Sequence, residues 1–133
     1  MAFRLLRIGK KVTRFEDTHL AAMNAVRSTQ GDLWFAISSS GSTKEVVHAV
    51  RQAHQRDTPV ISLTNITHSA LSSISTESLI AARPEGPLTG GAFASKVGAL
   101  LLVDVLVNTL LEQYPEYAES VVDTAEVVMP LMI

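Results

Sequence analysis

The chain has 133 residues, of which 47% are hydrophobic and 18% charged, and it carries a formal net charge of −2. This length and apolar content predict a single folded domain over residues 1–133 and exclude a disordered chain. The sequence has no cysteine, which excludes disulfides, thiolate catalysis and Cys-ligated zinc and is compatible with a cytoplasmic location. The near-neutral charge argues against a phosphate backbone as a partner of the whole chain.

The first predicted elements alternate between strand and helix. Residues 11–15, KVTRF, predict a short strand. Asp17 or Thr18 then begins a helix that stops at Gly31. The apolar residues of this helix at helical spacing are Leu20, Met23 and Val26. The apolar run 33–38, LWFAIS, predicts a strand that is buried on both faces.

The middle of the chain continues the same alternation. Residues 43–56 show helical spacing, with valines on one face and polar side chains on the other. The segment VISLT, residues 60–64, predicts a third buried strand, and residues 65–75 predict a loop with a short helix. The segment SLIAA, residues 78–82, predicts a fourth strand.

A long apolar helix is expected at residues 92–113, after a loop rich in Pro and Gly. Its polar side chains Asp104, Asn108 and Glu112 form one narrow stripe, so we expect cover on two sides, by the sheet and by a second subunit. Buried strands that alternate with helices predict an α/β fold. We therefore expect a three-layer sandwich in which helices flank a parallel sheet of about four strands.

Small hydroxyl side chains cluster directly after the strand at 33–38. Ligands of open parallel sheets bind at the carboxyl ends of the strands, which is where this cluster lies. Ser42 is expected to cap the next helix, with Glu45 completing a capping box. Free N–H groups and the positive end of the helix dipole then favour an anion, which we expect to be a phosphate. The predicted phosphate site consists of Ser38, Ser39, Ser40, Gly41 and Thr43.

Serine and glycine clusters are also ordinary turn and cap chemistry, and spacing alone does not separate the two interpretations. The pattern is neither a Walker loop nor a G-x-G-x-x-G loop, which argues against nucleotides.

The segment ISSSGSTKEV contains an S-x-S-G-x-T pattern that resembles the phosphosugar-binding loop of the SIS (sugar isomerase) domain. The segments RLLRIGKKVTRFEDTHLAAMNAV, TPVISLTNITHSALSSIS and GGAFASKVGALLLVDVL resemble the SIS domain of the RpiR family of bacterial transcriptional regulators. The resemblance covers most of residues 3–111. It implies a parallel sandwich of roughly five strands, phosphosugar binding, oligomerisation and a DNA-binding helix-turn-helix domain.

The sequence departs from the family pattern at its N-terminus. Residues 1–10 resemble the end of the first SIS helix, so DNA binding is expected only through a helix-turn-helix domain that these residues do not include. The family's first strand and its loop are also missing, which would leave an exposed sheet edge. The apolar tail at 126–133 or a second chain could fill that gap, but a plain C-terminal helix broken at Pro130 agrees equally well with the sequence.

Two further residues are candidates for the ligand site. His19 could face the cleft or lie on the surface, and resemblance to the family's D-x-H segment favours a ligand role. Lys96, in the first turn of the long helix, could complement a phosphate or be solvated. No histidine has metal-ligand spacing to another, so we expect neither a metal nor a cofactor.

Three functions remain open at this point. A sensor needs only different affinities of its states for a sugar phosphate, whereas an aldose–ketose isomerase needs a positioned base. SIS isomerases often carry a glutamate in the segment that reads GGAFASK here, and this sequence has no acid between Glu85 and Asp104. That favours the sensor, although His19 could serve as a base. The third interpretation is a fragment that folds only in an assembly.

Overall fold

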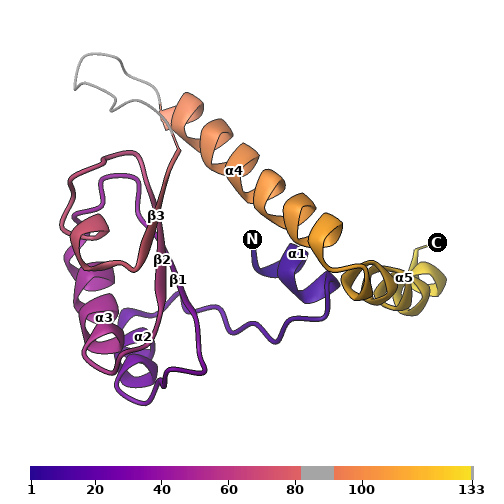
Figure 1. Cartoon of the computed structure of the whole chain (residues 1–133), viewed down its shortest axis with the longest axis horizontal. Helices are drawn as coiled ribbons and strands as arrows, with labels where there is room; N and C mark the ends of the chain where they lie inside the picture. Colours follow the sequence, from indigo (N-terminus) through magenta and orange to yellow (C-terminus); the bar gives the residue numbers. More distant parts are fainter. Residues whose placement is uncertain (82–91, 133) are drawn as a thin grey trace. The chain divides into compact units, whose positions relative to one another are not determined.

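The computed structural model describes residues 1–81 and 92–132 (Figure 1). The chain forms two compact units. Unit 1 combines residues 1–14 with residues 101–133, and unit 2 consists of residues 15–100. Each unit has buried apolar side chains of its own, for example Ile8 in unit 1 and Val60 in unit 2. The candidate site lies in unit 2.

Unit 2 is built on a parallel three-stranded sheet in the order β1-β2-β3. The strands are β1 (Trp34–Ile37), β2 (Val60–Thr64) and β3 (Glu77–Ile80). All three are parallel neighbours, so their carboxyl ends meet at one edge of the sheet. The predicted α/β class and parallel sheet are confirmed, with three of the four predicted strands present in the described residues. Residue 82 of the predicted fourth strand lies outside them.

Two helices, α2 (Thr18–Ala25) and α3 (Lys44–His54), lie on the same side of this sheet (Figure 1). Helix α3 is strongly amphipathic, and its apolar face packs on β1 and β2. A short 3₁₀ helix, η1 (Ser72–Ile74), also contacts α3. The resulting core consists of Ala25, Ala36, Val47, Val50, Ala53, Val60 and Leu71. This core holds the carboxyl end of β1 and the start of α3 in fixed positions.

The predicted strand at residues 11–15 is wrong, because the segment forms no regular structure. Lys11, Thr13 and Arg14 make most of it polar, so it cannot be buried as a sheet strand is. Phe15 finds an apolar partner instead: its ring stacks on that of Trp34, with centroids 5.8 Å apart and an angle of 12° between the planes.

Strand β1 and helix α2 are less buried than their sequences predict. Within the described residues β1 is an edge strand, and the side chain of Ile37 is 51% exposed. In α2 the small residue Ala25 packs into the core, while Leu20 and Met23 point to solvent. Apolar spacing therefore identified the helix correctly but indicated the wrong buried face.

Unit 1 is helical. It contains α1 (Ala2–Arg7), the later part of α4 (Ala92–Gln113), α5 (Glu116–Val128) and the 3₁₀ helix η2 (Met129–Leu131). The predicted long helix is confirmed, and so is the helix that is broken near Pro130. Among the described residues no single helix is long and apolar enough to cross a bilayer; only α4 and α5 taken together meet that requirement, and they are bent by 113°.

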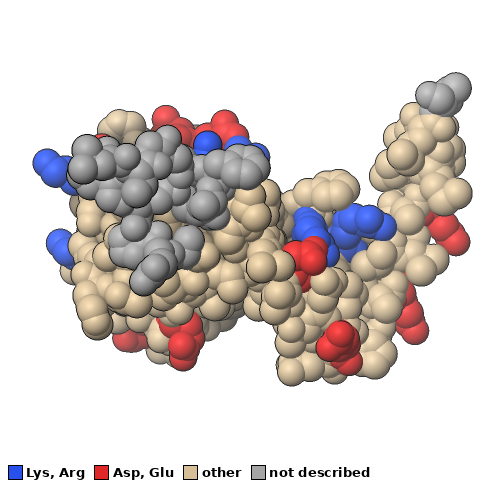
Figure 2. Space-filling view, turned by 90° about the horizontal axis from the view of Figure 1, so that it is seen from above, with Lys and Arg blue, Asp and Glu red and all other residues tan. Residues whose placement is uncertain are grey.

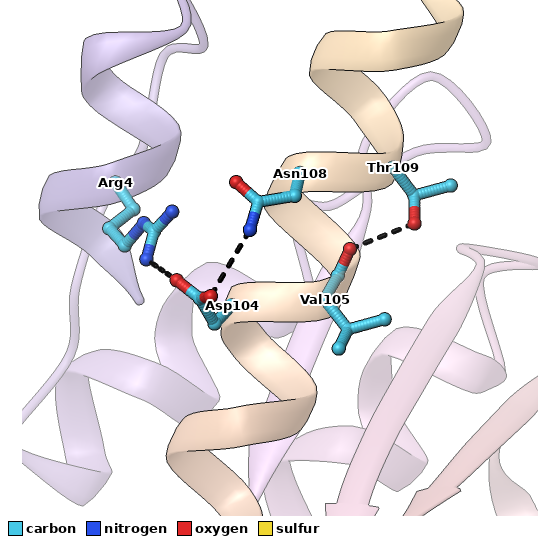
Figure 3. A network of polar contacts seen from close by, with 5 residues as sticks. All are labelled: Arg4, Asp104, Val105, Asn108 and Thr109. Atoms are coloured by element: carbon cyan, nitrogen blue, oxygen red, sulfur yellow. Dashed lines mark hydrogen bonds and ion pairs between the residues drawn. The ribbon is translucent and has the colours of Figure 1, made fainter.

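Polar contacts connect the helices of unit 1 (Figure 3). The carboxylate of Asp104 pairs with the guanidinium of Arg4 and accepts a hydrogen bond from Asn108 Nδ2 at 3.1 Å. After the end of α1, Lys10 Nζ lies 3.9 Å from the ring centroid of Tyr117. Part of the polar stripe predicted on α4 is thus the side that pairs with α1.

Candidate functional site

The serine-rich loop, residues 38–43, connects the carboxyl end of β1 to the start of α3. Two backbone hydrogen bonds hold it against the neighbouring strand β2. Ser38 N donates to Leu63 O at 3.0 Å, and Asn65 N donates to Ser39 O at 3.0 Å. The loop therefore has a fixed position at the edge of the sheet where ligands of such folds bind.

The base of the serine-rich loop is closed by its own side chains. Ser38 is buried, and its Oγ lies 2.9 Å from Thr43 Oγ1, so the first and last residues of the loop are hydrogen-bonded to each other. Ser40 at the tip is exposed, and its Oγ accepts a hydrogen bond from Ser42 N at 3.2 Å. Accepting that bond leaves the hydroxyl proton of Ser40 available for a ligand.

Gly41 brings the backbone of the loop against a second segment of the chain. It has a φ of +60°, a conformation that costs side-chain-bearing residues energy. A Cβ at this position would lie 2.2 Å from Ser69 Oγ and 2.8 Å from Thr64 Oγ1. Leu71 N also donates to Gly41 O at 2.9 Å. Only glycine permits this approach.

The predicted capping box is wrong. Thr43, rather than Ser42, is the N-cap of α3, and it makes no side-chain cap bond. Ser42 is engaged within the turn instead, because its Oγ donates to Ser40 O at 3.3 Å. The first turn of α3 therefore keeps N–H groups that a capping box with Glu45 would have occupied.

Several backbone N–H groups of the serine-rich loop and the start of α3 have no protein acceptor in the described residues. Within residues 1–81 and 92–132, the amides of Ser39, Ser40, Thr43 and Lys44 donate to no acceptor. Four free amides, a free hydroxyl proton and the positive end of a helix dipole form a suitable arrangement for a phosphate group.

The serine-rich loop holds five of the predicted site residues, whereas the other two candidates lie elsewhere. His19 is exposed in the first turn of α2, and Lys96 is exposed on α4. Neither side chain makes a hydrogen bond or ion pair with the loop in the described part of the chain. Their ligand roles stay predictions, and Glu85 lies outside the described residues.

A second loop, residues 65–73, belongs to the site and was interpreted from the sequence only as a connection. It follows β2, whose carboxyl end is next to that of β1. Thr64 Oγ1 donates to Ser39 O at 3.3 Å, and Ser69 packs on Gly41. Ser69 is buried and bonded to Ser72, so this loop also has an ordered shape. The signal that could have revealed it is its position, directly after the strand adjacent to β1.

Within residues 1–81 and 92–132, no three His, Asp or Glu side chains are grouped so that they could hold a metal ion. The site consists of hydroxyls and amides, which recognise an anion by hydrogen bonds alone.

Comparison with known proteins agrees with this chemistry. Residues 1–109 match the SIS domain family. An uncharacterized HTH-type transcriptional regulator of Caldanaerobacter subterraneus is 34% identical over 122 residues, which are 91% of this chain and 43% of that protein. The chain thus spans less than half the length of this relative.

Two solved structures are also similar. The NanR protein of Vibrio vulnificus, solved in complex with ManNAc-6P, is 78% identical with a TM-score of 0.93, over 98% of this chain and 50% of that one. The sugar isomerase domain of an RpiR transcription factor from Sphaerobacter thermophilus is 23% identical with a TM-score of 0.76, over 94% and 68% of the two chains. The second likeness shows the fold.

Proposed function

Because the chain belongs to the SIS domain family, we propose that it is the sugar-phosphate-binding part of a bacterial transcriptional regulator of the RpiR type. The relatives support this, since they are HTH-type regulators and NanR. Such a regulator binds DNA through a helix-turn-helix domain and works in the cytoplasm, where the DNA is. The chain's own part is to bind the effector.

The observation that carries this proposal is the set of unpaired amides in front of α3. A phosphate placed there accepts hydrogen bonds from Ser39, Ser40, Thr43 and Lys44 N–H groups, none of which has another acceptor in the described residues. The Ser40 hydroxyl adds one more donor. Because the loop is already fixed by Ser38, Gly41 and the second loop, little conformational entropy is lost when the ligand binds.

ManNAc-6P is the sugar phosphate that we propose as the ligand. The support is the relative solved with it, NanR, which is 78% identical to this chain over 98% of the chain's length. The second loop packs on Gly41 of the serine-rich loop through Ser69, and we expect its polar residues Thr67 and His68 to contact the sugar. Its polar character suits a ligand with hydroxyl and amide groups.

Effector binding regulates by shifting populations. A sugar phosphate that binds one state of the regulator more tightly favours that state by its difference in affinity. A homo-oligomer, as the family resemblance implies, would transmit this shift to paired DNA-binding domains.

An isomerase is the second candidate, and the relatives with isomerase in their names share only the fold with this chain. Isomerisation needs a base within hydrogen-bond reach of the substrate carbon's proton. Among the described residues no carboxylate or imidazole makes a hydrogen bond or ion pair with the serine-rich loop, and His19 is the base that the sequence analysis singled out. Turnover of ManNAc-6P or another sugar phosphate that disappears in His19→Ala would establish this function instead.

The proposal is tested by calorimetric titration and thermal unfolding of the 133-residue chain with ManNAc-6P, its unphosphorylated parent sugar and other sugar phosphates. At about 100 times the dissociation constant, a ligand specific for the folded state adds ~2.7 kcal/mol of stability. We expect binding of ManNAc-6P and none of the parent sugar. Equal binding of ManNAc-6P and its parent sugar would show that the phosphate group is not recognised. Binding of a different sugar phosphate alone would show that the site binds phosphate but that ManNAc-6P is not its ligand.

A further inference from the structure

The first four residues of the serine-rich loop form a tight turn, because Gly41 N donates to Ser38 O at 3.0 Å. Its two central residues are Ser39 and Ser40. Types II, I′ and II′ need a positive φ at a central residue, and among the described residues other than glycine only Asp57 has one. The turn is therefore of type I. Rotation of the peptide between the central residues converts type I to type II, so the turn alone sets the direction of the Ser40 N–H only weakly.

Two donors from the neighbouring segment hold the carbonyl group of this central peptide. Ser39 O accepts a hydrogen bond from Asn65 N at 3.0 Å and another from Thr64 Oγ1 at 3.3 Å. In a trans peptide the carbonyl and the following N–H point in opposite directions. Because Ser39 O is turned toward the second loop, the N–H of Ser40 is turned away from it and stays without an acceptor in the described residues.

The hydroxyl of Thr64 supports this arrangement from both sides. It donates to Ser39 O, and it accepts a hydrogen bond from Ile66 N at 3.2 Å. The second bond fixes the backbone around Asn65, whose N–H is the other donor to the same carbonyl. Thr64 Oγ1 also lies against Gly41, since a Cβ there would be 2.8 Å away. Thr64 is fully buried, so water does not compete for these bonds.

The direction of each donor matters because the two loops are uncharged. Residues 38–43 and 64–73 include no Lys, Arg, Asp or Glu. In Figure 2 the surface of unit 2 that is not grey is mainly uncharged, and its charged side chains lie near the rim. A neutral N–H binds an anion well only when it points at the anion. A rotated Ser39–Ser40 peptide would present its carbonyl oxygen to the phosphate instead.

We propose that Thr64 is a positioning residue of the phosphate site. Its hydroxyl keeps the Ser39–Ser40 peptide in the orientation that directs the Ser40 N–H to the anion, and it does so without touching the ligand. This inference rests on the proposed sugar-phosphate function and adds a residue from a different strand to it. The role needs a donor and an acceptor on one side chain, which serine also supplies and valine does not.

Calorimetric titration of the 133-residue chain with ManNAc-6P tests the role. We expect Thr64→Val to raise the Kd about tenfold, as the loss of one hydrogen bond to a charged group does. Thr64→Ser keeps the hydroxyl and loses a methyl group, so it should bind like the native chain although it unfolds at a lower temperature.

Thr58→Val is the matched control. Thr58 is also buried, and its hydroxyl is bonded to Ser28 Oγ at 3.0 Å, before β2 begins. This variant should lose stability and keep its affinity. Circular dichroism verifies that each variant is folded. Equal affinity of the native chain and folded Thr64→Val, or an equal loss in Thr58→Val, would overturn the positioning role.

Nuclear magnetic resonance of the ligand-free chain measures the peptide orientation itself. Ser39 Hα comes close to the Ser40 amide proton only in the rotated peptide. The nuclear Overhauser effect between them should be weak in the native chain and in Thr64→Ser, and stronger in Thr64→Val. An unchanged effect in Thr64→Val would contradict the hold on the peptide.

A last measurement needs no variant and separates this inference from the proposed function. In the native chain the Ser40 amide proton should shift downfield with ManNAc-6P and not with its parent sugar. Binding without that shift would overturn the direction inferred for the Ser40 N–H and leave the proposed function intact. A native chain that binds no sugar phosphate would contradict the proposed function, whereas the ligand-free spectra would still decide whether Thr64 holds the peptide.

Discussion

The geometry of the candidate site depends more on Gly41 than on any serine, because the two loops pack against each other at its α-carbon. Its φ of +60° and the 2.2 Å separation of a Cβ from Ser69 Oγ oppose any side chain. We predict that Gly41→Ala lowers the free energy of unfolding by about 1–3 kcal/mol and weakens sugar-phosphate binding by displacing the second loop. Urea unfolding and calorimetry measure the two effects. Gly31→Ala is the control, since its Cβ would lie 3.7 Å from its nearest neighbour, and an equal loss there would refute the steric argument.

Ser40 is the serine whose hydroxyl proton is free, and its exposure means that the fold does not depend on it. A hydrogen bond to a charged group contributes roughly 1.5–3 kcal/mol. Ser40→Ala should therefore raise the dissociation constant for the sugar phosphate at least tenfold, with no change in unfolding temperature of the free protein. Ser28→Ala is the control. It makes the same chemical change beside Thr58, which precedes β2 and so lies near the amino ends of the strands, away from the serine-rich loop. Unchanged affinity in Ser40→Ala would place the phosphate elsewhere.

At the level of elements, the two helices of unit 2 begin in different ways. Asp17 caps α2, with its carboxylate accepting a hydrogen bond from Leu20 N at 2.8 Å, whereas Ser42 makes no cap bond to α3. Loss of an N-cap costs about 1 kcal/mol. We predict that Asp17→Ala destabilises the chain by that amount and that Ser42→Ala changes stability by a few tenths of a kcal/mol. Denaturant unfolding of both variants measures the two changes. A loss of unfolding free energy in Ser42→Ala as large as that in Asp17→Ala would indicate that Ser42 does cap α3.

The sequence predicted the elements better than it predicted their environment. The strands β1 and β2, the amphipathic α3 and the long α4 follow from apolar periodicity, which tertiary packing here reinforces. The segment at 11–15 failed because strand formation needs a neighbour, and a five-residue pattern contains no information about one. The capping box failed because Ser42 had a competing local partner, Ser40 O.

For the site, five of the seven predicted residues lie in one loop because they fall within the six-residue stretch 38–43. The second loop was missed because only the parallel pairing of β1 with β2 brings Ser69 to Gly41. Contacts between residues that are far apart in sequence depend on strand order, which local patterns do not specify.

At the level of the whole molecule, the ligand site and helix α5 belong to different units. We predict that the sugar phosphate slows amide hydrogen exchange at residues 39–46 and 64–73, where amides gain acceptors or the loops lose motion. The amides of α5 should exchange at unchanged rates at constant protein concentration. Mass spectrometry of peptides from both units measures this, with the parent sugar as the control. Protection confined to unit 1 would contradict the location of the site.

The division of the chain also separates its chromophores. The only tryptophan, Trp34, stacks on Phe15 in unit 2, and the only two tyrosines, Tyr114 and Tyr117, lie with rings 5.1 Å apart in unit 1. Indole emission therefore reports on the sheet and phenol absorbance on the helices, without any label. The two signals can be followed during one denaturant titration, so the chain itself indicates whether its two parts melt together or in turn.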